Sequence, residues 1–244
     1  MRLIFIAYLV LLHAFMVAAL VQTDILARVQ NKLASNVEQE EITPFYYAMV
    51  DFHTRVDKNI PDNSVIFLGD SLIQGLAVSS VASSAINFGI GADTTKGLIQ
   101  RIHYYSAISR SQAVVVAIGI NDLNRRNNKE IMSNYKKIVS LIPSNVPILF
   151  SAVLPIDEEI LNTSSFNERI RNLNSELEEL CGTSKRLYFL DITTLLNSTE
   201  GRLSEIFHIG DGLHLNALGN AVWISKLKDG LNKINLGNNK TSIE

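Results

Sequence analysis

Two side chains far apart in the sequence, a serine and a histidine, could together carry out acyl transfer. Ser71 follows the apolar run VIFLG and one aspartate. A serine hydroxyl is a weak nucleophile at neutral pH and needs an adjacent base. His214 is the candidate base, because Asp211 lies three residues before it and a carboxylate in the same turn can fix the imidazole tautomer. Each residue also has an ordinary structural interpretation, since Ser71 can cap a helix and DGLHLN can be a surface turn.

An acyl-transfer site also needs hydrogen-bond donors directed at the oxyanion that forms on the reacting carbonyl. Asn121 offers a side-chain amide, and the turn GIGADTT and the backbone of Ser71 offer N–H groups. Asn121 can equally be a turn or cap residue. Whether these donors act together depends on the elements that carry them.

Short apolar runs predict the strands that position these residues. The runs cover residues 64–69, 84–89, 113–119, 146–154 and 186–192. Runs of this length with few alternating polar residues suit strands buried on both faces. Helical periodicity over 131–142 and 166–180, and after Asn216, predicts the intervening and closing helices. We therefore expect an α/β fold, a three-layer α/β/α sandwich around a mainly parallel five-stranded sheet.

The polar clusters follow the predicted strands. GDS follows the first strand, GIGADTT the second and GIND the third, and DGLHLN precedes the closing helix. In open α/β sheets, ligands bind beyond the carboxyl ends of the strands. We expect all four clusters to lie along that edge.

The composition and the missing motifs exclude several classes of protein. The 244 residues carry a formal net charge of −2, which gives no electrostatic case for a nucleic-acid partner. The single cysteine, Cys181, excludes an intrachain disulfide and argues against a structural zinc site. GIGADTTKG lacks the Gly-Lys-Ser/Thr sequence of a P-loop and the third glycine of a dinucleotide-binding turn, and GDSLI lacks the Gly-x-Ser-x-Gly elbow.

The N-terminal segment differs from the rest of the chain. Residues 3–21 form a 19-residue run without a formal charge after Arg2, which is long enough to span a bilayer. Residues 17–19 resemble a signal cleavage site. We expect residues 1–23 to be a signal anchor, with the catalytic domain outside the cytoplasm, or a cleaved signal peptide of a secreted or periplasmic protein. The other expected parts are a helical linker or appendage over 24–60, the catalytic domain over 61–236 and a flexible tail over 237–244.

Taken in order, the four clusters resemble the sequence blocks of the SGNH, or GDSL, hydrolase superfamily. The blocks are Gly69-Asp70-Ser71-Leu72, NFGIGADTT, Gly119-Ile120-Asn121-Asp122 and Asp211-Gly212-Leu213-His214. The second block is most similar to the platelet-activating-factor acetylhydrolase-like esterase branch. The resemblance covers about residues 60–235 and implies a flavodoxin-like hydrolase fold without metal or cofactor.

The resemblance also implies roles for individual residues. Ser71 would be the nucleophile, His214 the general base and Asp211 the residue that orients the histidine. These roles predict a serine esterase that hydrolyses short-chain or acetyl esters through an acyl-enzyme. The alternatives are an O-acyltransferase or deacetylase acting on envelope glycans and a catalytically inert binding module of the same fold. Expected partners are a small-molecule, lipid or glycan acyl ester and, through the N-terminal segment, a membrane.

The oxyanion hole implied by the resemblance uses the N–H of Ser71, an N–H of the second block and the Asn121 amide. The family usually has a glycine where this chain has Ala92, with Gly91 one position earlier. A backbone N–H survives this change, but a position that needs a positive φ resists alanine. We expect Ala92 to be the donor, with Gly91 as a neighbouring alternative that adjusts the turn.

Overall fold

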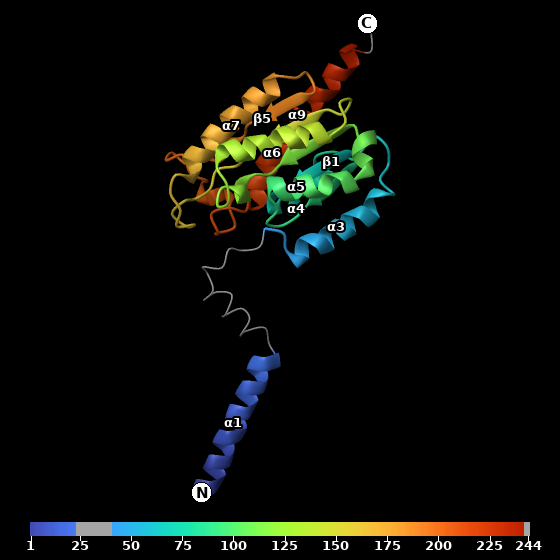
Figure 1. Ribbon diagram of the computed structural model, residues 1–244. Coiled ribbons are helices and arrows are strands. Elements are labelled where there is room, and N and C mark those ends of the chain that lie inside the picture. Colours follow the sequence, from blue (N-terminus) through green and yellow to red (C-terminus); the bar gives the residue numbers. More distant parts are fainter. Residues whose placement is uncertain (23–40, 242–244) are drawn as a thin grey trace. The chain divides into compact units, whose positions relative to one another are not determined.

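The computed structural model describes residues 1–22 and 41–241, which belong to two compact units (Figure 1). The first unit spans Met1–Glu40 and the second Glu41–Glu244. Helix α1 (Arg2–Gln22) lies in the first unit. The helices of the second unit are α3 (Pro44–Asp57), α4 (Ser71–Gln74), α5 (Thr95–Arg101), α6 (Asn128–Leu141), α7 (Phe166–Gly182), α8 (Thr193–Leu196) and α9 (Ala217–Thr241).

The second unit is built on a parallel sheet of five strands. The strands are β1 (Val65–Gly69), β2 (Ala85–Gly89), β3 (Ala113–Ala117), β4 (Ile148–Ser151) and β5 (Leu187–Leu190). Their spatial order is β2-β1-β3-β4-β5, which is the flavodoxin-like order. All neighbouring pairs are parallel, and Gly69 lies opposite both Gly89 and Ala117. The predicted α/β fold and parallel sheet are confirmed.

Helices cover both faces of the sheet and make the three-layer sandwich (Figure 1). Alternate strand residues such as Ile66 and Val114 pack with α5, α6 and α7. Their neighbours in the strands, such as Phe67 and Val115, pack with α4, α8 and α9 around Trp223. The central strands β1, β3 and β4 are buried on both faces and consist of apolar runs, as the sequence indicated, whereas the edge strands β2 and β5 are only partly buried.

Strand β4 is shorter than the apolar run that predicted it. Pairing ends at Ser151, and residues 152–157 then continue the chain without regular secondary structure. There the backbone of Val153 pairs with the Asn174 side chain, and that of Ile156 with the Asn167 side chain, at 2.9–3.0 Å. Side-chain amides thus replace the missing strand partner, which sequence periodicity could not reveal.

Helix α3 belongs to the same compact unit as the sheet. Tyr46 and Val50 are buried against Ile90, and the His53 ring lies 4.8 Å from the Phe88 ring. The unit therefore begins at residue 41, whereas the sequence analysis began the catalytic domain at residue 61 and assigned α3 to the appendage. Helix α9 continues to Thr241, through most of the predicted tail.

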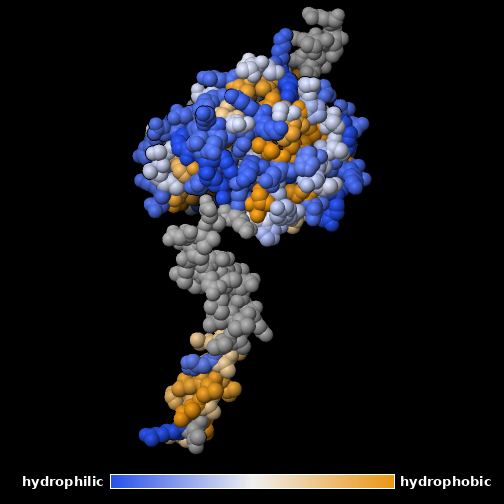
Figure 2. Space-filling view, in the orientation of Figure 1, coloured by the Kyte–Doolittle hydropathy of each residue, from blue (hydrophilic) through white to orange (hydrophobic). Residues whose placement is uncertain are grey.

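Helix α1 carries exposed apolar side chains, including Ile4, Phe5 and Leu11 (Figure 2). In the part of the chain that the structure describes, none of the helices combines the length and apolarity needed to cross a membrane. The predicted membrane segment is therefore not supported, and the location of the catalytic domain stays a prediction. Within the helical linker or appendage expected over residues 24–60, residues 24–40 lie outside the described residues.

Candidate active site

Ser71 is the first residue of α4, at the turn where the chain leaves β1. Asp70 caps this helix, since its Oδ1 accepts a hydrogen bond from the Leu72 N–H at 2.9 Å. The helix lies very close to the end of β2, because a Cβ on Gly89 would come within 2.2 Å of the Gln74 nitrogen. The capping role that was the ordinary interpretation of the serine is thus filled by the aspartate before it.

Ser71, His214 and Asp211 form one hydrogen-bonded line at the carboxyl edge of the sheet. Ser71 Oγ lies 2.9 Å from His214 Nε2, and His214 Nδ1 lies 2.6 Å from Asp211 Oδ2. A neutral imidazole with its proton on Nδ1 satisfies both contacts: it donates to the carboxylate and accepts from the serine hydroxyl. The structure therefore brings these three residues together, although Ser71 and His214 are 143 positions apart along the chain.

The Asp211 carboxylate has further partners in its own loop. Its Oδ1 accepts from the backbone N–H groups of Leu213 and His214, at 3.0 and 2.9 Å. Partial burial works against ionisation, but the hydrogen bonds from His214 and the two backbone groups hold the pKa of Asp211 below its ordinary value. The carboxylate can therefore stay ionised beside the imidazole.

A second histidine, which the sequence analysis did not select, holds the loop that carries His214. His208 is buried, and its Nδ1 accepts from the N–H groups of Gly210 and Gly212 at 3.0 and 3.3 Å. Its proton is then on Nε2, which has no hydrogen-bond partner in the described part of the chain. A bridge between His208 and Leu215 closes the loop. A loop histidine gives no sequence signal for such a role.

Ala92 adopts a φ of 61°, in the left-handed region that favours glycine. The turn after β2 thus has its positive φ at Ala92. The neighbouring Gly91, the alternative considered from the sequence, has no positive φ. Ala92 is exposed, and within the described residues its N–H donates to no protein acceptor. Its backbone N–H is thus available to a ligand at this edge.

Asn121 lies in the 3₁₀ turn that follows β3, beside the Ala92 turn. Its Nδ2 donates to the carbonyl of Asp93 at 2.9 Å. The amide nitrogen carries a second N–H, which can donate to another acceptor. Gly119 makes this turn feasible, because its φ is 127° and a Cβ there would come within 2.6 Å of the Tyr135 hydroxyl. The candidate donor of the third block is therefore hydrogen-bonded to the residue that follows Ala92, the candidate donor of the second block.

A buried ion pair supports the Ala92 turn from the protein interior. Arg101 is fully buried, and its Nε donates to Asp93 Oδ2 at 2.8 Å. Its other nitrogens donate to the carbonyls of Phe88 and Gly69, at 2.8 and 3.0 Å. Burial raises the pKa of Asp93 to about 6, although the Arg101 charge opposes this. Nothing in the sequence indicates this role of Arg101, since the residue lies in no block and shows no spacing pattern.

Other polar residues of the blocks have structural partners. Asp70 is buried, and burial raises the pKa of its carboxyl to about 7. Asn87 Nδ2 donates to the carbonyl of Ile73 in α4 at 2.7 Å and to that of Leu76, just after the helix, at 3.1 Å. Thr94 caps α5, accepting from the Gly97 N–H at 3.2 Å. These residues shape the site without a free group directed at a substrate.

The arrangement offers a nucleophile with its base, and candidate oxyanion donors, at the same edge of one sheet. That combination is suited to acyl transfer. Among the described residues, no group of three or more His, Cys, Asp or Glu side chains could hold a metal ion.

Comparisons with known proteins agree with this chemistry. The profile of the GDSL-like lipase/acylhydrolase family matches residues 67–222. Platelet-activating factor acetylhydrolase IB subunit alpha1 from Bos taurus is 26% identical over 170 residues, which cover 67% of this chain and 72% of the relative. Two solved structures are also similar in fold. A structure from Streptococcus pneumoniae described as a platelet activating factor has a TM-score of 0.73 at 20% identity, covering 82% of this chain and 99% of that chain.

The second structure is a GDSL-like lipase from Bacteroides thetaiotaomicron, with a TM-score of 0.67 at 17% identity, covering 75% of this chain and 97% of that chain. At such identities the structures support the fold alone. The family match spans more than half of the 244 residues and includes Ser71, Ala92, Asn121 and His214. The chain therefore belongs to the GDSL-like lipase/acylhydrolase family and is an ester hydrolase.

Proposed function

We propose that this protein is a serine esterase that uses Ser71, His214 and Asp211 in a two-step reaction through an acyl-enzyme. The observation that supports this most directly is the unbroken line of contacts, 2.9 Å from Ser71 Oγ to His214 Nε2 and 2.6 Å from His214 Nδ1 to Asp211 Oδ2. Both distances lie in the normal range for hydrogen bonds.

In the first step, Ser71 Oγ attacks the ester carbonyl carbon while His214 Nε2 takes the hydroxyl proton. Asp211 stabilises the imidazolium that forms. The imidazolium then protonates the leaving alcohol, and the acyl group remains on the serine. In the second step, His214 takes a proton from the water that attacks the acyl carbon, and it returns this proton to Ser71 Oγ as the acyl–oxygen bond breaks and the acid is released.

The negative charge of each tetrahedral intermediate is held by the N–H groups of Ser71 and Ala92 and by the Asn121 amide. Ser71 begins α4, and the first N–H groups of a helix have no partner within it. Ala92 is exposed and its N–H has no protein acceptor among the described residues, and Asn121 has a second amide proton beside its contact with Asp93. Removal of one such donor from an enzyme typically lowers kcat by about 10²–10³-fold.

We further propose that the acyl group is short, with acetyl esters as the substrate class. The support is that the curated relatives at 26% identity are acetylhydrolases by name. The test is the hydrolysis of p-nitrophenyl acetate, butyrate and octanoate by the full-length chain. We expect kcat/KM to fall as the acyl chain lengthens. Equal or rising values along the series would contradict a short acyl pocket.

The mechanism is tested with the same acetyl ester and a fluorophosphonate probe. Ser71→Ala should lower kcat by about 10⁴-fold or more, and His214→Ala should abolish labelling by the probe. His103→Ala is the matched control, because His103 is exposed and lies outside the site. The mechanism is wrong if Ser71→Ala hydrolyses the ester as fast as the parent protein.

A further inference from the structure

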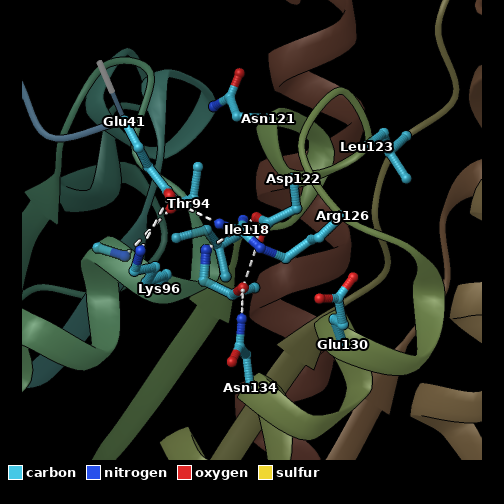
Figure 3. A network of polar contacts seen from close by, with 12 residues as sticks. Glu41, Thr94, Lys96, Ile118, Asn121, Asp122, Leu123, Arg126, Glu130 and Asn134 are labelled. Carbon is cyan, nitrogen blue, oxygen red and sulfur yellow. Dashed lines mark hydrogen bonds and ion pairs between the residues drawn. The ribbon is translucent and has the colours of Figure 1, made fainter. Parts of the chain in front are cut away.

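Glu41, the first residue of the catalytic unit, lies outside the region that matches the family profile and yet contacts Thr94 of the second block and Arg126, four residues after the third block. Its carboxylate accepts hydrogen bonds from the Thr94 hydroxyl and the Arg126 guanidinium (Figure 3). The Lys96 ammonium lies 3.7 Å away. One carboxylate therefore contacts the loop after β2 and the loop after β3.

The contact with Thr94 leads to the Ala92 turn. Thr94 caps α5 and follows Asp93, whose carbonyl accepts the Asn121 amide at 2.9 Å. Glu41 therefore contacts the chain one residue beyond the carbonyl that orients the Asn121 side chain. A shift of Thr94 would move that carbonyl and the Ala92 N–H together, since they lie in one continuous turn.

The contact with Arg126 leads to the same asparagine from the other side. Arg126 bridges Glu41 and Asp122, and Asp122 is the residue after Asn121 (Figure 3). Asp122 is buried and also accepts from the N–H and hydroxyl of Thr95, the N–H at 2.9 Å. The network thus closes on itself through α5 and ties together the two turns that supply the donors.

The members of this network are sheltered from solvent. The side chains of Glu41, Arg126 and Asp122 are 16%, 10% and 0% exposed. Burial works against the charge of Glu41, but hydrogen bonds from Thr94 and Arg126 hold its pKa below the ordinary value. A contact between charged groups with little exposure is screened weakly by solvent, so it can hold geometry that a surface ion pair would not.

We propose that Glu41 is a positioning residue for the oxyanion hole, holding the Ala92 N–H and the Asn121 amide in register with each other. This rests on the proposed function. An oxyanion hole acts on the transition state, so a loss of register should lower kcat and leave KM nearly unchanged. A residue that only stabilises the fold would lower the melting temperature and leave kcat per active enzyme unchanged.

The experiment measures kcat and KM for p-nitrophenyl acetate, with active enzyme counted by fluorophosphonate titration. Glu41→Ala should lower kcat by about tenfold, less than the 10²–10³-fold expected when a donor is deleted outright. Glu41→Gln keeps the shape of the side chain and an acceptor for the Thr94 hydroxyl. This variant should therefore fold like the parent and lose part of the parental kcat. A parental kcat for both variants would overturn the proposal.

The matched control is Glu130→Ala. Glu130 is drawn in the same view but caps the N-terminus of α6, with its Oε2 accepting from the Asn127 N–H at 3.0 Å (Figure 3). This variant should lower the melting temperature and leave kcat per active site unchanged. If it lowers kcat as much as Glu41→Ala does, the effect is one of stability and the proposal fails.

A double-mutant cycle with Asn121→Ala identifies the route of the effect. If Glu41 acts through the Asn121 amide, Glu41→Ala should cost less in the Asn121→Ala background than in the parent. An equal or larger cost there would overturn the assignment. The outcome is separate from the proposed function: an active Ser71→Ala refutes that function, whereas an inactive Ser71→Ala with a parental Glu41→Ala refutes only this inference.

Discussion

The two sides of the proposed active site are built differently. On the proton-transfer side, the side chains of His214 and Asp211 are 38% and 39% exposed and belong to one short loop. On the oxyanion side, the supporting charges Arg101, Asp93 and Asp122 are almost completely buried and come from separate elements. The residues of the first side are close together in the sequence and partly open to solvent, whereas those of the second come from separate elements and are enclosed.

The difference follows from what each side must do. An imidazole exchanges protons with substrate and water, so it needs access and one orienting partner. Oxyanion donors act by being held in place before the charge develops, so their supports gain from rigidity. We therefore expect substitutions on the proton-transfer side to affect activity alone, and those deep on the oxyanion side to affect stability as well.

The largest effect on activity within this comparison is expected from Asp211→Asn. The amide cannot hold the imidazole in the tautomer that leaves Nε2 as an acceptor, and such a change in a serine triad can lower kcat by about 10⁴-fold. The melting temperature should stay close to that of the parent because the residue is part-exposed. Kinetics on p-nitrophenyl acetate and a thermal melt check both parts. A strongly destabilised variant would remove the contrast between the two sides.

The largest effect on stability is expected from Arg101→Met. Breaking a buried ion pair typically costs about 3–5 kcal/mol, because the partner charge is left without compensation. The burial that already raises the pKa of Asp93 to about 6 would then raise it further. The folded state would bind a proton that the unfolded state has released, so the variant should lose stability as pH rises from 5 to 8.

Urea unfolding of both proteins at these two pH values measures this effect. The free energy of unfolding of Arg101→Met relative to the parent should be lower at pH 8 than at pH 5. A pH-independent difference would mean that Asp93 finds another cation or stays solvated.

The next effect is expected from Asn121→Ala. The loss of a donor should lower kcat by about 10²–10³-fold with little change in KM. Because the side chain also donates to the Asp93 carbonyl, a small loss of stability, about 1 kcal/mol, should accompany it. Steady-state kinetics with a thermal melt give both values. An unchanged kcat would show that the Asn121 amide is not an oxyanion donor.

The smallest effect is expected from Ala92→Gly. The positive φ is free of strain for glycine, while the N–H donor is retained, so kcat should stay within about twofold and stability should change by less than about 1 kcal/mol. Ala92→Val is the matched contrast, because a β-branched residue strongly resists this region. It should lower both kcat and melting temperature, and equal behaviour of the two variants would show that the turn geometry does not matter.

The sequence by itself determined the class of fold and the local parts of the site. Apolar runs are typical of strands buried on both faces, and this pattern does not depend on the details of side-chain packing. Asp211 and His214 are three residues apart, so their contact depends only on the local turn. Ser71 was predicted from its place after a strand, and its hydroxyl is not needed as the cap of α4, because Asp70 caps that helix.

Only the tertiary structure decided which residues support these groups. Arg101 reaches carbonyls of two strands, and Glu41 contacts side chains 53 and 85 positions away along the chain. One ring nitrogen of His208 accepts hydrogen bonds from two backbone N–H groups. Such contacts leave no periodic pattern in the sequence, because they depend on where whole elements pack and on which buried charge needs a partner. The chemical groups can thus be predicted from residue type and spacing, whereas their supports depend on the packed core.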